Sequence, residues 1–410
     1  MSNKKTDTEP DIKAVTDRQE PISMMEPLLV AIDSRHRGEL NDLAVDLAAK
    51  AAGFRRSLPE GILHSLADLV RSMNCYYSNL IEGHDTHPID IERALNKDYS
   101  TDSRERNLQR EARAHIEVQA WIDRGGLTGK TTTEDSIREI HRRFGELLPE
   151  ELLWAEDPQT GERIRVIPGA LRERDVKVGH HVPVSPGAVT RFLERFEEVY
   201  SGQGRSETII GVAAAHHRLL WIHPFVDGNG RVARLMSHAT LLETLNTGSI
   251  WSVARGLARN VKPYTTLLSN CDLTRRNELD GRGNLSEEAL IEFTRFFLQT
   301  CLDQVDFMES LVQPGRLRHR LLTWTGEEIA MGTLPPKSEL VLEAILYRGE
   351  LPRKEVPNLL GVGERQARRV VSALIGRDVL KSVSSRAPLS LAFPARLAPR
   401  WMPGLFPEKE

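Results

Sequence analysis

The chain is poor in cysteine, in aromatic residues and in long apolar stretches. Its three cysteines, Cys75, Cys271 and Cys301, are odd in number and too widely spaced for a disulfide framework or a Cys-x-x-Cys metal site. No apolar run reaches the roughly 18 residues of a membrane-spanning helix, and the first ten residues, MSNKKTDTEP, lack the apolar core of a signal peptide. We therefore expect buried thiols, no membrane contact and a cytoplasmic location.

The 410 residues, 40% hydrophobic and 28% charged, are enough for two or three domains with a substantial core. Apolar residues recur mostly at helical spacing, which predicts a mainly α fold. We divide the chain into a mobile tail (1–24), an N-terminal helical region (25–125), a central core (126–310), a linker (311–335), a C-terminal module (336–400) and a short tail (401–410).

The most informative stretch is HPFVDGNGRVARLM, residues 223–236. Pro224 disfavours a helical conformation at the preceding residue, so His223 is expected at a helix exit, facing a cleft. Gly228 and Gly230 allow a tight turn to which a ligand can come close, and a helix restarts after it. The free amides of that first turn, with the helix dipole, form an anion site.

Charged residues around this turn predict what the anion is. Arg231 and Arg234 share one face of the first helical turn, where cations oppose the helix dipole, and such a broken local rule is expected at functional sites. Asp227 is a suitable ligand for a hard cation, and His223 is a base that titrates near neutrality. Together these residues predict a site for a polyphosphate with Mg²⁺.

The stretch resembles the signature of the Fic family, H-x-F-x-[D/E]-G-N-G-R-x-x-R, at every position. The resemblance implies a Fic-type helical bundle in which residues 126–310 are the catalytic core. It implies that His223 deprotonates a target hydroxyl, Asp227 holds Mg²⁺, Gly228, Asn229 and Gly230 cradle the α- and β-phosphates of ATP, and Arg234 binds the γ-phosphate with help from Arg231. The activity it implies is transfer of AMP from ATP to a Ser, Thr or Tyr of a protein, possible self-modification included.

An upstream helix with an apolar stripe from Leu66 to Leu80 is predicted to end at Gly83. Glu82 then lies in the last turn, where an acid is disfavoured by the dipole, and Ser78 lies one turn earlier. The hexapeptide SNLIEG resembles the inhibitory motif [S/T]-x-x-x-E-[G/N] of the Fic family. The resemblance implies that Glu82 pairs with Arg234 and thereby restrains the enzyme.

Two further segments are expected to contribute. Ile164, Val166 and Ile167 alternate toward Pro168-Gly169, and Val176, Val178 and Val182 alternate beyond it, which predicts a β-hairpin. In the Fic family this place holds the flap, whose edge binds the target main chain, here through Gly169, Val176 and Val178. An ordinary surface hairpin is the alternative. The charged run at 104–113 is expected to be a solvated face.

Residues 336–400 predict three helices (338–347, 353–360 and 363–377) and a two-stranded wing at 379–393, which resembles a winged helix-turn-helix. This segment carries twelve Lys/Arg and six Asp/Glu, a net +6 in a chain of net −3. Such asymmetry favours a nucleic acid or another acidic partner. Winged helices also serve as protein contacts or dimer modules, so DNA binding and a homodimer both stay open.

The sequence therefore predicts an autoinhibited protein adenylyltransferase with an appended winged helix. Two alternatives remain. One is a DNA-binding regulator whose core senses nucleotide, although sensing alone needs no histidine base. The other is an enzyme that removes AMP, with Glu82 orienting water.

Overall fold

The computed structural model describes residues 15–157 and 160–407, and most of them are helical. The N-terminal part holds α1 (Arg37–Arg56), α2 (Glu60–Ile81), α3 (Pro88–Leu95), α4 (Ser103–Asp123) and α5 (Glu134–Glu146). The central part holds β1 (Trp154–Glu156), β2 (Arg163–Arg165), α6 (Val189–Tyr200), α7 (Arg205–Ile222), α8 (Asn229–Leu245), α9 (Val253–Arg259), α10 (Val261–Asn270) and α11 (Glu287–Val312). The C-terminal part holds α12 (Pro314–Ala330), α13 (Ser338–Arg348), β3 (Glu350–Leu351), α14 (Val356–Leu360), α15 (Glu364–Gly376), β4 (Leu380–Lys381), β5 (Leu389–Leu391) and α16 (Ala398–Trp401).

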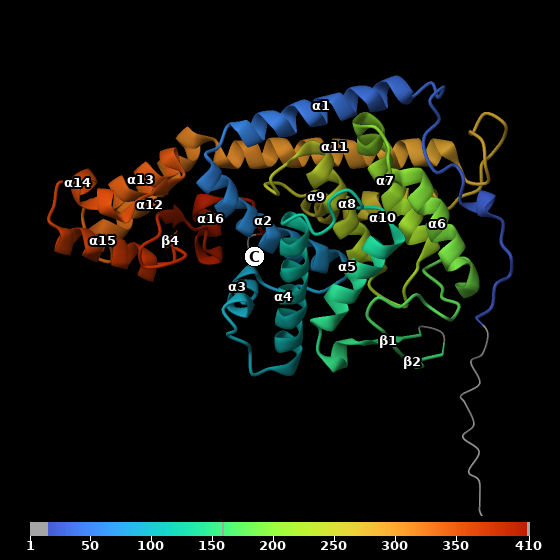
Figure 1. The fold of residues 1–410 in the computed structure, drawn as a ribbon, viewed down its shortest axis with the longest axis horizontal. Coiled ribbons are helices and arrows are strands. Elements are labelled where there is room, and N and C mark those ends of the chain that lie inside the picture. Colours follow the sequence, from blue (N-terminus) through green and yellow to red (C-terminus); the bar gives the residue numbers. More distant parts are fainter. Residues whose placement is uncertain (1–14, 158–159, 408–410) are drawn as a thin grey trace, which may run out of the picture.

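Helices α7 and α8 form the centre of the bundle. Helix α7 is buried along almost its whole length, which fits a sequence that is apolar or small on every face, IIGVAAAHHRLLWI. It packs on α8 and α6, while α1 and α11 lie side by side along one edge of the molecule (Figure 1). Only six residues, 223–228, separate the end of α7 from the start of α8, so the loop between the two helices is held by the rigid core.

The C-terminal elements gather at one end of the molecule (Figure 1). Helices α13, α14 and α15 accompany a three-stranded antiparallel sheet of order β3-β5-β4. Most of the linker expected over 311–335 is helical: α12 occupies Pro314–Ala330 and buries Leu317, Leu321 and Trp324. An amphipathic helix therefore joins the core to the C-terminal module.

Both predicted tails are in part packed segments. Residues 1–14 lie outside the described residues, but residues 15–24 run along the core, where Glu20 accepts a hydrogen bond from the Ser185 hydroxyl at 2.6 Å. At the other end Trp401 and Leu405 are buried, and the Tyr77 hydroxyl of α2 donates to the Leu405 carbonyl at 2.9 Å. Residues 401–407 are therefore not a free tail.

The β-hairpin lies upstream of its predicted place. Strand β1 pairs with β2, Trp154 opposite Arg165 and Glu156 opposite Arg163, so the chain reverses between 157 and 162. Pro168 and Gly169 do form a turn, with Gly169 left-handed at φ of 77°, but it packs against α5, where the Gly169 N–H donates to His141 Nδ1 at 2.9 Å. Beyond it only an isolated bridge, Val178 to His181, forms in the described part of the flap region.

The charged run at 104–113 is also not wholly solvated. Gln109 and Glu111 are buried at 1% and 2% exposure: Gln109 bonds the backbone of the α3–α4 connection, and the partners of Glu111 lie in the site described below. Within residues 15–157 and 160–407, every helix is too short or too polar to cross a membrane.

Candidate active site

His223 occupies the corner between α7 and α8. Its backbone is left-handed, with φ of 51°, and its N–H closes α7 by donating to the Leu219 carbonyl at 3.0 Å. Few residues other than glycine adopt this conformation, and strain of this kind persists only where the surroundings enforce it. The predicted helix exit at Ile222 is confirmed, and the corner sets the direction of the imidazole.

Arg172 is the residue that enforces this corner, and the sequence analysis missed it. Its guanidinium is 2% exposed and donates to the carbonyls of His223 at 2.8 Å, Arg174 at 3.0 Å and Ile222 at 3.4 Å. The Arg172 N–H adds a bond to the Pro224 carbonyl at 2.9 Å. Through these hydrogen bonds to backbone carbonyls, the buried Arg172 side chain connects the flap region to the His223 corner.

The loop after His223 is held from inside by two side chains. The Asn229 amide accepts from the Phe225 N–H at 3.0 Å and donates to the Phe225 carbonyl at 2.9 Å, so it shapes the turn. The His141 ring stacks on Phe225 with centroids 3.9 Å apart. Because Gly169 donates to its Nδ1, the proton is on Nε2, which donates to the Asp227 carbonyl at 3.2 Å. Burial lowers the pKa of His141 to about 4, which keeps this ring neutral.

Helix α8 starts at this loop with its amides facing an acidic side chain of α2. Gly228 is left-handed, with φ of 85°, as the turn requires. At Gly230 a Cβ would lie 2.5 Å from Glu82 Oε1, so a larger residue there would require that carboxylate to shift. Glu82 thus occupies the position at the N-terminus of α8 where an anion is favoured.

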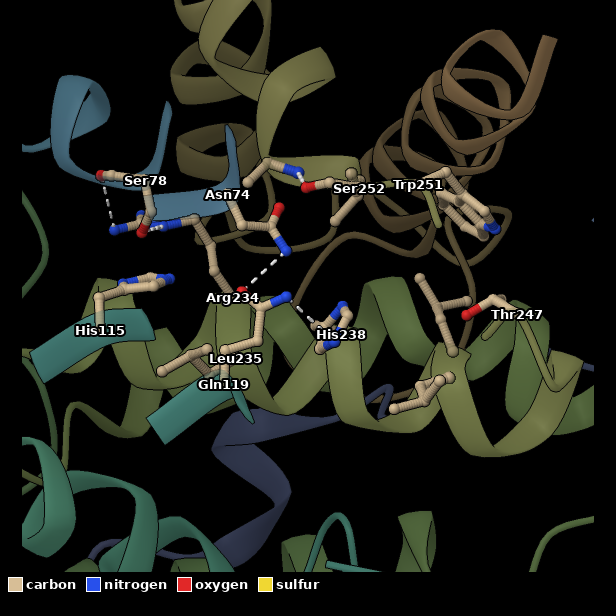
Figure 2. A pocket seen from close by; sticks show the side chains of 14 residues that line it. Asn74, Ser78, His115, Gln119, Arg234, Leu235, His238, Thr247, Trp251 and Ser252 are labelled. Atoms are coloured by element: carbon tan, nitrogen blue, oxygen red, sulfur yellow. Dashed lines mark hydrogen bonds between the residues drawn. The ribbon is translucent and has the colours of Figure 1, made fainter. Parts of the chain in front are cut away.

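Arg234 connects α8 to the predicted inhibitory residues. Its Nε donates to Ser78 Oγ at 2.8 Å, its Nη2 donates to the Ser78 carbonyl at 3.3 Å, and Nη2 also forms an ion pair with Glu82 (Figure 2 shows the bonds to Ser78). Arg234 is 4% exposed. Burial alone raises the pKa of the Glu82 carboxyl, but the charge and hydrogen bond of Arg234 outweigh it and leave the pKa below its ordinary value. The pair is therefore ionised at neutral pH.

Arg231 takes part in a second ion-pair group beside the first. Its Nη1 pairs with Glu111 of α4, and its Nη2 donates to Asp227 Oδ2 at 3.1 Å. Asp227 keeps half of its side chain exposed, 52%, whereas Glu111 keeps 3%. Asp227 is therefore the carboxylate that a ligand from solvent can reach.

A cavity of about 460 Å³ opens beside His223. It is lined by Arg18, Ala155, Glu156, Asp157, Ile164, Asp175, Val176, Lys177, Val178, Val182, His223 and Val226. Of the predicted target-binding residues, Val176 and Val178 line it and Gly169 does not. Burial, with the nearby Arg172 charge, lowers the pKa of His223 to about 4. The imidazole is thus an unprotonated base at neutral pH, next to a cavity walled by the hairpin.

On the Arg234 side, a much smaller cavity of about 20 Å³ lies between α2, α4 and α8. Figure 2 shows Asn74 bonded to Gln119, and Gln119 directed at His238, around it. It is about the size of one water molecule and too small for a nucleotide.

His216 and the three cysteines are structural. His216 bonds Ser237 at 2.9 Å and the Tyr264 hydroxyl at 2.8 Å, deep in the core. The three cysteines are free and buried, which confirms the prediction of thiols. Among the described residues no three His, Cys, Asp or Glu side chains gather as a metal site.

Residues 131–241, which include the whole loop and both arginines, match the Fic/DOC family. The chain therefore carries a Fic domain in this segment. Relatives named protein adenylyltransferase Fic are 38% identical over 112 residues in Drosophila grimshawi and 37% identical over 113 residues in Drosophila melanogaster. Each match covers 27% of this chain and 20% of the relative, so the chain spans about one fifth of the length of these relatives.

Solved Fic structures are also similar to this chain. A Fic family protein from Desulfovibrio desulfuricans G20 aligns over 85% of this chain and 96% of its own, with 14% identity and a TM-score of 0.48. Fic-1 from C. elegans aligns over 65% and 71%, with 17% identity and a TM-score of 0.48.

Proposed function

We propose that this Fic protein transfers AMP from ATP to a Ser, Thr or Tyr hydroxyl of a protein and is autoinhibited by Glu82. The observation that carries the proposal is a neutral histidine at a cavity mouth, five residues before a glycine turn that opens a helix. A family of named adenylyltransferases shares that segment. The hairpin that walls the cavity, with Val176 and Val178, supports a protein segment as the acceptor.

In the proposed reaction the target hydroxyl attacks the α-phosphorus of ATP while its proton moves to the unprotonated nitrogen of His223. The bond between the α-phosphorus and the oxygen bridging to the β-phosphate breaks, and pyrophosphate leaves. The amides of Gly228 to Gly230 and the N-terminus of α8 hold the phosphates, and Arg231 and Arg234 neutralise their charge. Positioned donors of this kind stabilise charge that develops in the transition state.

Asp227 would hold Mg²⁺ together with phosphate oxygens. Its half-exposed carboxylate beside the glycine turn fits a cation that keeps several waters and takes one or two protein carboxylates. Magnesium would supply charge neutralisation on the phosphates as pyrophosphate leaves.

Autoinhibition follows from the two partners of Arg234. In the proposed arrangement the γ-phosphate needs the guanidinium that Glu82 and Ser78 now hold, and the Glu82 carboxylate stands at the N-terminus of α8. ATP then binds with its phosphates in a nonproductive position. If the pairing favours that position by about 3 kcal/mol, the productive one falls below roughly 1%.

The test is to incubate the purified protein with Mg²⁺ and ATP labelled on the α-phosphate, with and without a lysate, and to look for label on protein. Label from α- but not γ-labelled ATP would establish AMP transfer. Absence of label with both the wild-type chain and Glu82→Gly, while ATP binds, would favour a nucleotide-sensing regulator. Loss of label from a pre-modified protein, dependent on Glu82, would indicate AMP removal.

We also propose that residues 336–400 act as a winged helix that binds duplex DNA. The exposed side chains of Arg365, Arg368 and Arg369 on α15, beside the β4–β5 pair, support this. Duplex affinity of the full chain should fall steeply with salt, because neutralised phosphates release counterions. Replacing the three arginines by alanine should remove it. If the full chain does not bind a duplex even at low salt, the module serves a protein contact or a homodimer.

A further inference from the structure

Glu111 is a buried acid whose two oxygens serve two different parts of the site. It comes from the middle of α4, is 2% exposed, and pairs through Oε1 with Arg231 of α8. Its Oε2 lies 2.8 Å from Nδ1 of His84, which follows the inhibitory turn. No motif of the sequence singles it out, and its neighbours along the chain are a charged run.

Arg231 needs a permanent counter-ion. The residue is 9% exposed, with its guanidinium 5.0 Å from the centre of the Phe144 ring. A buried ion that loses its partner is costly. Asp227, the other partner of Arg231, is half exposed, and in the proposed reaction it binds a cation that also contacts the phosphates. Glu111 has no such second role, so it can hold Arg231 throughout.

We propose that Glu111 is a positioning residue: it holds Arg231 at the first turn of α8 for the phosphates of ATP and, through His84, ties that arginine to the inhibitory turn. This rests on the proposed function of the site for ATP.

The tie to the inhibitory turn is a second attachment of the same segment. Glu82 is bound to Arg234, and two residues later His84 is bound to Glu111, with left-handed Gly83 between them. Arg231 and Arg234 lie three residues apart on α8, so the turn is fastened at two adjacent points. The hydrogen bond to Glu111 and the charge of Glu82 raise the pKa of His84, and burial and the charge of Arg231 lower it. The net effect is a raised pKa, which favours the imidazolium form.

ATP affinity tests the positioning role without relying on transfer. We compare Glu82→Gly with Glu82→Gly/Glu111→Gln by titration with ATP and, separately, with adenosine. We expect ATP to bind about tenfold more weakly to the second variant and adenosine to bind equally. Glu117→Gln is the matched control, because Glu117 lies on the same helix in an exposed pair with Arg113. Unchanged ATP affinity, or an equal loss for ATP and adenosine, would overturn the positioning role.

His84→Gln tests the tie and remains informative if a substitution at Glu111 prevents folding, because 43% of the His84 side chain is exposed. We expect basal AMP transfer to rise several-fold in the wild-type background and to stay within about twofold in Glu82→Gly, since contacts that act as one unit are not additive. An equal rise in both backgrounds, or no rise in the wild type, contradicts the tie. If no variant transfers AMP, the proposed function fails while the ATP titrations still decide the role of Glu111.

Discussion

Replacing Glu82 by glycine should activate the enzyme. The substitution removes an ion pair with an almost fully buried guanidinium and clears the N-terminus of α8. A hydrogen bond to a charged group contributes about 1.5–3 kcal/mol. If that energy separates the nonproductive from the productive ATP position, the rate of transfer should rise roughly 10- to 150-fold. Glycine is tolerated locally, because Glu82 is the cap of α2 and not an interior helical residue.

The assay is the initial rate of AMP incorporation from labelled ATP, with ATP affinity measured on the same preparations. Ser78→Ala is the graded control: it removes the bond to Arg234 Nε but leaves the ion pair, so it should activate less. The pKa of Glu82 lies below its ordinary value, so the carboxylate is fully charged at any pH above that ordinary value. Only acid that protonates Glu82 should break its ion pair with Arg234 and relieve the inhibition. An unchanged rate in Glu82→Gly, with ATP binding intact, would refute the autoinhibition.

Three other outcomes are expected. In the Glu82→Gly background, His223→Ala should lower kcat by roughly 10² to 10⁴-fold and leave the Kd for ATP within about twofold, because only the base is lost. An equally large loss of ATP affinity would show that His223 acts in binding instead. In that same background kcat/KM should be flat from about pH 6 to 8 and fall only as the pH drops toward the His223 pKa of about 4, where the imidazole becomes protonated. A pH profile of kcat/KM with its midpoint near 6.5 would contradict a buried neutral base. Arg172→Ala should lower the free energy of unfolding, measured by urea titration, by about 3 kcal/mol or more, because buried carbonyls lose their hydrogen-bond donor. Arg174→Ala is the control: Arg174 forms only an exposed ion pair with Glu162, so its loss should lower that free energy by under about 1 kcal/mol.

Local sequence signals were enough for the helices and the position of the central loop. The apolar stripe from Leu66 to Leu80 lies in α2, which ends just before Gly83 as expected, and Pro224 and the glycines place the corner at His223 correctly. The α2 motif likewise brings Ser78 and Glu82 to Arg234 as expected. Each of these signals depends on residues close in the chain.

What the sequence did not predict depends on contacts between distant segments. Glu111 and Arg172 look like solvated charges in their own neighbourhoods, and only the folded chain buries them beside Arg231 and the His223 corner. The hairpin was displaced for the same reason: alternation continues past Gly169, but the turn at that glycine packs on His141 of α5, and β2 pairs with β1 instead. Burial of polar groups is a tertiary property, and apolar periodicity does not report it.

The packing of residues 401–407 against α2 bears on how the protein is handled in the laboratory. Phe406 meets the edge of the Tyr76 ring, two residues before Ser78, with centroids 5.6 Å apart, and Arg255 Nη2 donates to the Gly404 carbonyl at 2.7 Å. A substitution or fusion that disturbs residues 401–407 should therefore also disturb the seating of α2, the helix that leads to Glu82. The proposed activity is best compared in preparations that leave these contacts intact.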